Sequence, residues 1–142
     1  LIKMVKNLRP KKASDKALIE LFGLEAFLDK KLGNLSGGTK QKVNILLTFM
    51  FESDLIILDE PTTGLDPISL IHLKEIINKE KERGKTILIT THIMSFVEEI
   101  ADEIVFLLDG KIYFKGTSAA LRKQTEQVDL EHAIAKLISK EL

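Results

Sequence analysis

The sequence predicts an α/β fold in which a parallel sheet is flanked by helices. Two apolar runs, residues 55–58 and 86–91, have the length and composition of buried strands. The segment between them, residues 68–81, carries leucine and isoleucine at helical spacing. Strands that alternate with helices over short connections pair in parallel through right-handed crossovers. The first run has no polar alternation, which is typical of a strand that is covered on both faces.

The composition of the chain suits one folded domain. Of its 142 residues, 44% are hydrophobic and 30% are charged. Basic and acidic residues balance at 21 each, so the charge gives no support for binding to nucleic acid or to an anionic membrane. The absence of cysteine excludes disulfides and thiolate metal sites. No apolar run approaches the ~20 residues of a membrane span. The first residues lack the apolar core and cleavage site of a signal peptide. Since the chain does not begin with methionine, we expect it to be part of a longer protein.

The N-terminal part, residues 1–34, is predicted to form short helices joined by polar turns. Ser14 is placed to cap a helix and Gly23 to end it, and residues 24–28 suit one further helical turn. Residues 44–51 are apolar almost all round, so we expect them to form a buried helix. This helix would begin at the segment Ser36-Gly37-Gly38.

The C-terminal part continues the alternation. Apolar residues from Ile93 onward recur at helical spacing, and residues 103–108 are predicted to be a third strand. Asp109-Gly110 is the preferred two-residue turn of a hairpin, which leads into residues 111–115. The tail is predicted to be mainly helical.

Three polar side chains follow the two apolar runs. Asp59 and Glu60 end the first run and His92 ends the second. Parallel strands end at the same edge of a sheet, so these residues should converge there, where open α/β folds bind ligands. An aspartate can hold Mg²⁺ while a neighbouring glutamate polarises the attacking water in phosphoryl transfer. Alternatively, the acid pair is a solvated strand end and His92 a loop histidine.

The segment Ser36-Gly37-Gly38 allows two interpretations. A helix start with unpaired N–H groups and a serine hydroxyl forms an anion site, and two glycines let a ligand or another backbone approach. An ordinary serine N-cap preceded by a turn fits the same residues.

A phosphate-cradling loop of the form G-x-x-x-x-G-K-[ST] is not found in the chain. Residues 33–40 have two correctly separated glycines, but threonine and lysine stand in the wrong order. Residues 84–86 read Gly-Lys-Thr, but Lys79 occupies the first glycine position and the segment precedes its strand. We therefore expect this chain to lack the loop.

Four segments together resemble the motifs of ABC-type ATPases, in matching order and spacing. They resemble the signature motif, the Walker B strand, the D-loop and the switch histidine, and are residues 35–38, residues 55–60, residues 64–67 and His92. The resemblance spans nearly all of the chain. It implies a P-loop NTPase-like fold, with the Walker A motif and Q-loop located before Leu1, so that the chain alone would be inactive.

The resemblance also implies roles within one subunit of an ATP-hydrolysing enzyme. Asp59 would be the magnesium-side carboxylate, Glu60 the catalytic base and His92 the sensor of the γ-phosphate. ATP and Mg²⁺ are the implied cofactors.

Further implied roles lie across a head-to-tail dimer. Ser36, Gly37 and Gly38 would bind the ATP held by a second ABC ATPase subunit, and Asp66 would communicate across the interface. The other implied partners are transmembrane permease subunits, with no nucleic acid. The implied location is the cytoplasmic inner face of the cell membrane.

Two residues depart from the family pattern. Thr39 stands where the signature usually has glutamine, and Lys42 where arginine is usual. We expect these changes to tune the activity rather than remove it. Residues 129–134 resemble the acidic tail segment of exporter-type ABC ATPases of drug efflux and copper maturation. An amphipathic helix packed on the domain explains that segment equally well.

We predict one ABC ATPase domain, residues 1–142, with three regions. These are a helical and signature region over residues 1–50, a core sheet over residues 51–116 and a helical tail over residues 117–142. The predicted function is ATP hydrolysis coupled to membrane transport. A soluble ABC-type ATPase of DNA repair, chromosome maintenance or translation is the alternative, although residues 1–34 show no sustained heptads. A non-catalytic half that completes a partner's site is a third possibility, which the presence of both Glu60 and His92 disfavours.

Overall fold

The computed structural model describes residues 1–8 and 13–139, and it confirms the predicted α/β class. Residues 9–12 of the predicted helical region and residues 140–142 of the predicted tail lie outside the described residues. The chain divides into two units, Leu1–Thr90 and Thr91–Leu142. The predicted division into three regions stays a prediction.

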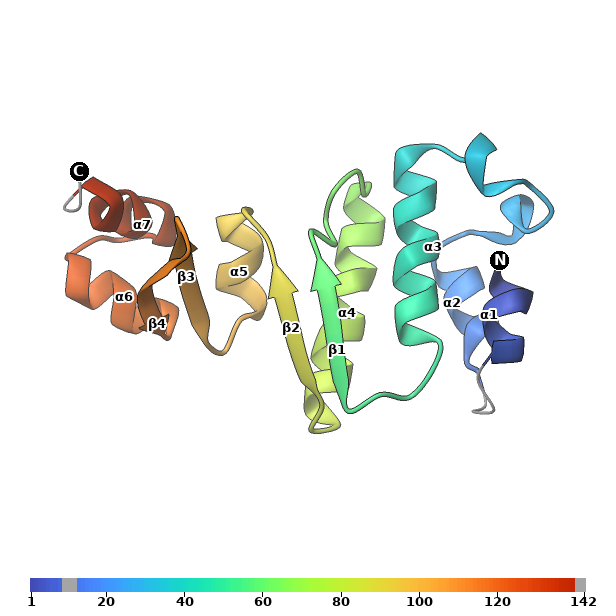
Figure 1. Ribbon diagram of the computed structural model, residues 1–142, viewed down its shortest axis with the longest axis horizontal. Coiled ribbons are helices and arrows are strands. Elements are labelled where there is room, and N and C mark those ends of the chain that lie inside the picture. The colour runs from blue at the N-terminus through green and yellow to red at the C-terminus, as the bar shows by residue number, and fades with distance from the viewer. Residues whose placement is uncertain (9–12, 140–142) are drawn as a thin grey trace. The chain divides into compact units, whose positions relative to one another are not determined.

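The first unit begins with helices, as the sequence predicts. These are α1 (Ile2–Leu8), α2 (Asp15–Leu21), two short 3-10 turns (Glu25–Phe27 and Leu32–Asn34) and α3 (Gly37–Phe49) (Figure 1). Gly23 adopts a φ of +60° just after α2, a left-handed conformation that favours glycine and ends the helix. Ser14 stands at the N-cap of α2, but its side chain makes no capping hydrogen bond.

The prediction that the helix after Gly38 is buried is only partly correct. Val43, Ile45 and Leu46 of α3 are buried, whereas Asn44 is exposed. The amide side chain of Asn44 is polar and therefore remains in water. The helix packs through one part of its surface.

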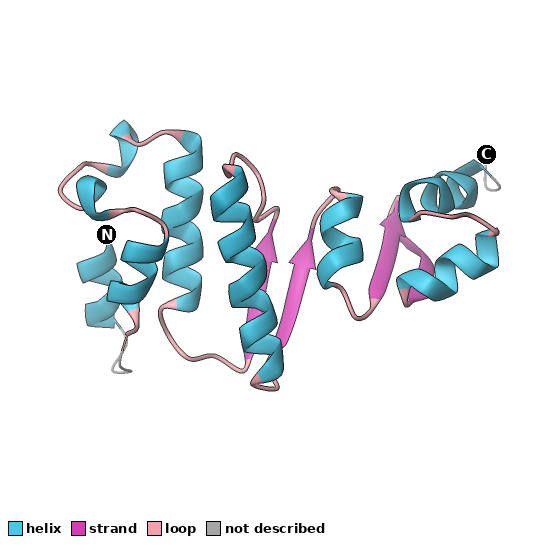
Figure 2. Ribbon diagram, turned by 180° about the vertical axis from the view of Figure 1, so that it is seen from behind, coloured by secondary structure: helices cyan, strands magenta, loops and turns pink. Residues whose placement is uncertain are grey.

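A parallel pair of strands forms the sheet of the first unit. β1 (Leu55–Asp59) and β2 (Thr86–Thr90) are joined by α4 (Pro67–Glu82), and the register places Asp59 opposite Thr90. The helix α4 lies behind both strands in Figure 1 and in front of them in Figure 2, so it covers one face of the pair. Ile56 and Leu58 of β1 are buried, as are Leu73 and Ile77 of α4.

The predicted burial of β1 on both faces is wrong. Leu55 and Ile57 are 55% and 61% exposed, and Leu88 of β2 is 56% exposed. Side chains of a strand alternate between its two faces, and α4 covers only the face that carries Ile56 and Leu58. The apolar run therefore has one buried and one exposed side.

The second unit contains a helix, a hairpin and two further helices. They are α5 (Met94–Ile100), β3 (Ile104–Leu108), β4 (Lys111–Gly116), α6 (Ser118–Thr125) and α7 (Leu130–Ser139). Asp109 and Gly110 have φ angles of +47° and +75°, as a tight hairpin turn between twisted strands requires. In the described residues β3 pairs antiparallel with β4, and the parallel sheet contains two strands, so the expected third parallel strand is not observed. The two-residue turn accounts for the antiparallel partner on one edge of β3.

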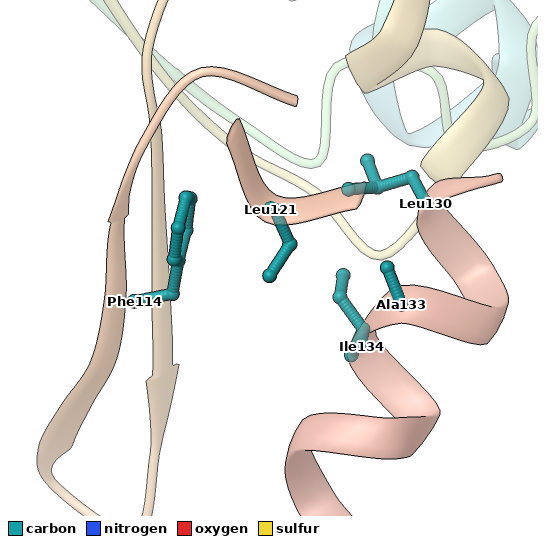
Figure 3. Close-up of a cluster of buried hydrophobic side chains, with 5 residues drawn as sticks. All are labelled: Phe114, Leu121, Leu130, Ala133 and Ile134. Carbon is teal, nitrogen blue, oxygen red and sulfur yellow. The ribbon is translucent and has the colours of Figure 1, made fainter. Parts of the chain in front are cut away.

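A compact apolar cluster stabilises the second unit. Side chains of β4, α6 and α7 point toward one another, as Figure 3 shows for Phe114, Leu121, Leu130, Ala133 and Ile134. The last three belong to the segment that resembles an exporter tail, and their burial supports the simpler interpretation of a packed amphipathic helix. No helix within residues 1–8 and 13–139 has the length and apolar character needed to cross a membrane.

Candidate active site

Ser36 caps the N-terminus of α3. Its Oγ accepts a hydrogen bond from the Thr39 N–H at 3.2 Å and lies 2.8 Å from Thr39 Oγ1. The serine N-cap predicted as one interpretation is therefore present. Ser36 and Gly37 are exposed, and nothing lies within 4 Å of a Cβ added at Gly37. A capped helix start with an open glycine backbone is also compatible with an anion site.

The signature segment packs closely against the loop that follows β1. A Cβ added to Gly38 would come within 3.0 Å of the carbonyl oxygen of Gly64, and Gly64 itself has a φ of +73°. Such an approach is sterically possible because Gly38 has no side chain. The two glycines thus bring the signature segment and the predicted D-loop into contact.

The acid pair lies at the end of β1, as predicted. Asp59 is the last residue of the strand and is exposed, and its Oδ1 accepts a hydrogen bond from the hydroxyl of Thr90 on β2. Glu60 leaves the strand with a φ of +43°, and its N–H donates to the Thr90 carbonyl oxygen at 2.9 Å. Its Oε2 is shielded from solvent. The end of β2 therefore holds the side chain of Asp59 and the backbone of Glu60.

Asp66 caps the N-terminus of α4. Its carboxylate accepts hydrogen bonds from the Ser69 N–H and hydroxyl, each at 2.9 Å, and forms an ion pair with Lys42 of α3 at 2.7 Å. The Lys42 ammonium, together with these two bonds, holds the pKa of Asp66 well below its usual range. This carboxylate therefore links the start of α4 to the middle of α3.

Replacing Lys42 with methionine is expected to raise the pKa of Asp66 toward its usual value, though not fully, because the Ser69 bonds remain. A depressed folded pKa contributes stability above the unfolded pKa of about 3.9, and this contribution is lost as the pH falls through the folded pKa. The Asp66 side chain is 47% exposed, so the loss in unfolding free energy at neutral pH should be below about 1 kcal/mol.

Carboxyl carbon NMR titration of Asp66 checks this expectation. The control is Lys79→Met, which removes a lysine about 20 Å further along α4. An Asp66 pKa that stays unchanged in the Lys42 variant would show that the ion pair does not set it. The difference in stability between Lys42→Met and the parent should begin to shrink as the pH falls below about 4, and it should vanish only once the pH is below the folded pKa of Asp66.

His92 belongs to the second unit and follows the end of β2 by two residues. Its predicted convergence with the acid pair therefore stays a prediction. The first unit does bring together Ser36 with Thr39, Gly38 with Gly64, and Asp59 with Thr90.

Sequence reasoning missed three contacts of the first unit. Thr90 contacts both acids, Lys42 binds Asp66, and the Gln41 side-chain amide donates to the carbonyl of Pro61 at 3.1 Å. The register of two apolar strands would have placed Thr90 beside Asp59. The contacts of Gln41 and Lys42 cross 20 or more residues of sequence and have no local signal.

No group of three or more metal-ligating side chains occurs among the residues that the structure describes. Mg²⁺, however, is commonly held by one or two carboxylates together with substrate phosphates and water. Asp59 has the chemistry of such a ligand, because it is exposed and its orientation is fixed by a hydroxyl donor.

Comparison with known proteins identifies relatives of the chain. A family model described as ABC transporter matches residues 2–63. The ABC transporter ATP-binding protein NatA of Bacillus subtilis is 33% identical over 128 residues, which are 89% of this chain and 52% of NatA. The lantibiotic transport ATP-binding protein SrtF of Streptococcus pyogenes is 43% identical over 95 residues, covering 67% of this chain and 42% of SrtF.

A solved structure of the ATP binding subunit of an ABC transporter has the same fold, with a TM-score of 0.81 at 36% identity. The superposition covers 87% of this chain and 52% of that one. The matched part is thus 42% to 52% of the length of these three proteins. It belongs to the ABC transporter family of ATP-binding proteins.

Proposed function

We propose that the intact protein is the ATP-hydrolysing subunit of a membrane transporter, in which hydrolysis drives movement of permease subunits. The observation that carries the proposal is the acid pair at the end of β1, with Asp59 held by the Thr90 hydroxyl and Glu60 by the Thr90 carbonyl. Relatives of this chain are named for transport, which favours a transporter over a soluble ATPase of DNA repair, chromosome maintenance or translation.

In this proposal Glu60 is the general base. It accepts a proton from the water whose oxygen attacks the γ-phosphorus of ATP, while the bond to the bridging oxygen breaks. Asp59 would hold Mg²⁺, which supplies positive charge that stabilises the phosphate oxygens. His92 would contact the γ-phosphate. In this proposal Glu60 supplies the base, Asp59 the metal ligand and His92 a hydrogen-bond donor to the γ-phosphate.

The signature segment would act on a second subunit. Ser36, Gly37 and Gly38 would bind the ATP of the opposite protomer in a head-to-tail dimer, and the exposure of Ser36 and Gly37 at the start of α3 supports this role. Asp66 would communicate across the interface. Its bonds to Lys42 and Ser69 would hold it in one orientation for that contact. The dimer would sit against permease subunits at the cytoplasmic face of the membrane.

The isolated chain is expected to bind Mg-ATP weakly. The phosphate-cradling loop would come from residues outside these 142, so the chain offers an acid pair without the backbone amides that hold the β- and γ-phosphates. Calorimetry of the 142-residue chain with Mg-ATP should show a Kd weaker than about 1 mM. Tight, saturable binding would contradict the assignment of the cradle to another segment.

A further inference from the structure

We propose that Gln41 is a positioning residue that aims Glu60 by holding the backbone on its C-terminal side. The inference rests on the proposed function, because it concerns the same hydrolysis and assigns Glu60 the role of base. It adds a residue that acts through Glu60 without touching the substrate.

The backbone of Glu60 is in a conformation that glutamate rarely adopts. Its φ of +43° lies in the left-handed region, where a Cβ crowds the backbone. Residues in this region persist only where the surroundings impose the conformation. The direction of the Glu60 side chain therefore depends on the groups that fix its two flanking peptides.

Hydrogen bonds fix Glu60 from both sides. On the N-terminal side, its N–H donates to the Thr90 carbonyl at 2.9 Å. On the C-terminal side, its carbonyl oxygen accepts from the Thr63 N–H at 3.2 Å and from Gln41 Nε2 at 3.4 Å. The same Gln41 nitrogen donates to the Pro61 carbonyl at 3.1 Å.

Gln41 is therefore the side chain that joins two consecutive carbonyls of this turn to another helix. Pro61 is fully buried. Because proline has no N–H, the carbonyl is the hydrogen-bonding group of its backbone. A buried carbonyl needs a donor, and Gln41 supplies one from α3. The turn direction after Glu60 is thus set by α3, the helix that starts at Ser36.

Small errors in the aim of a general base reduce its effect strongly. A misplacement of about 1 Å can lower the rate by about 10²-fold. Loss of the Gln41 donor would let the 60–61 and 61–62 peptides rotate more freely, because the bonds from Gln41 to the Glu60 and Pro61 carbonyls would both be gone. The expected defect is in the chemical step and not in ATP binding.

The test measures ATP hydrolysis by the intact protein with Gln41→Met, which keeps the length of the side chain and removes the donor. We expect kcat to fall by about 10- to 100-fold while the KM for ATP stays unchanged. Gln41→Lys, which retains an N–H donor, should recover most of the rate. The control is Gln127→Met, since Gln127 is also half-buried and also donates its amide to a backbone carbonyl, that of Thr125.

A double substitution separates positioning from a general loss of structure. Adding Gln41→Met to Glu60→Gln should lower the residual rate no further, because the base through which Gln41 acts is already gone. If the Gln41→Met variant does not fold, Gln41→Glu replaces it in both measurements, because glutamate has the same shape but offers an acceptor in place of the donor.

Two results would overturn the inference. One is a normal kcat in the Gln41 variants while Glu60→Gln is impaired, which would leave the proposed function intact. The other is a fall in kcat on adding Gln41→Met to Glu60→Gln that equals the fall caused by Gln41→Met in the parent protein. That result would assign Gln41 a structural role. An undiminished rate in Glu60→Gln alone would instead contradict the proposed function, and this inference with it.

Discussion

Replacing Glu60 with glutamine in the intact protein is expected to lower the rate of ATP hydrolysis by about 10²- to 10⁴-fold, the range of general base catalysis. Glutamine has nearly the same shape but cannot accept the proton of the attacking water. The backbone bond from the Glu60 N–H to Thr90 does not involve the side chain, so the turn should persist. ATP binding should therefore remain while phosphate release falls.

Glu126→Gln is the matched control for this substitution. Glu126 is also a glutamate with a left-handed backbone, at a φ of +55°, and it lies at the C-cap of α6. Its substitution should leave hydrolysis unchanged. Equal rates of phosphate release from the Glu60 variant and the parent would show that another residue is the base.

Replacing Gly38 with alanine is expected to reduce the unfolding free energy of the 142-residue chain by about 1–3 kcal/mol. The added Cβ would come within 3.0 Å of the Gly64 carbonyl oxygen, so either α3 or the loop after β1 must move. Neither can yield through a side-chain rotation, because the contact is with a backbone atom. In the intact protein this shift would also displace the signature segment and lower hydrolysis.

Gly37→Ala distinguishes this clash from the general effect of alanine in a helix. Nothing lies within 4 Å of a Cβ at Gly37, which is also in α3, so alanine there should stabilise the chain by up to about 1 kcal/mol. Urea denaturation of both variants measures the difference. Equal stabilities would show that the approach of Gly38 to Gly64 does not constrain the fold.

Local sequence signals predicted much of the secondary structure. Asp109-Gly110 forms the expected hairpin turn, and Gly23 ends α2 as expected. The helix between the strands begins at Pro67 after the Asp66 cap, close to its predicted start. Each of these features depends on a few adjacent residues, which is the information that a sequence displays directly.

Other features depend on what is folded beside a segment. Continuous apolar character in β1 did not reveal that only one of its faces is covered, because residues of both faces are equally apolar. The strand β3 was expected in the parallel sheet, whereas in the described residues it pairs antiparallel with β4. At the site, the positions of Asp59 and Glu60 were predictable, whereas the contacts of Gln41 and Lys42 arise only when α3 packs near the loop after β1.

Protection of a cysteine at position 36 by ATP tests the central claim most directly. The chain contains no cysteine, so Ser36→Cys introduces a single thiol into this part of the protein. It would be combined with Glu60→Gln, which retains ATP in the site. Thr117→Cys is the control, because Thr117 is likewise an exposed hydroxyl at a helix N-cap.

If the signature segment of one subunit covers the ATP of the other, Mg-ATP should slow labelling of the thiol in the Ser36→Cys variant by about 10-fold or more, an order-of-magnitude expectation for a site closed to solvent. Labelling of the Thr117→Cys control should not change. Equal labelling of position 36 with and without Mg-ATP would contradict the placement of this helix start at the nucleotide.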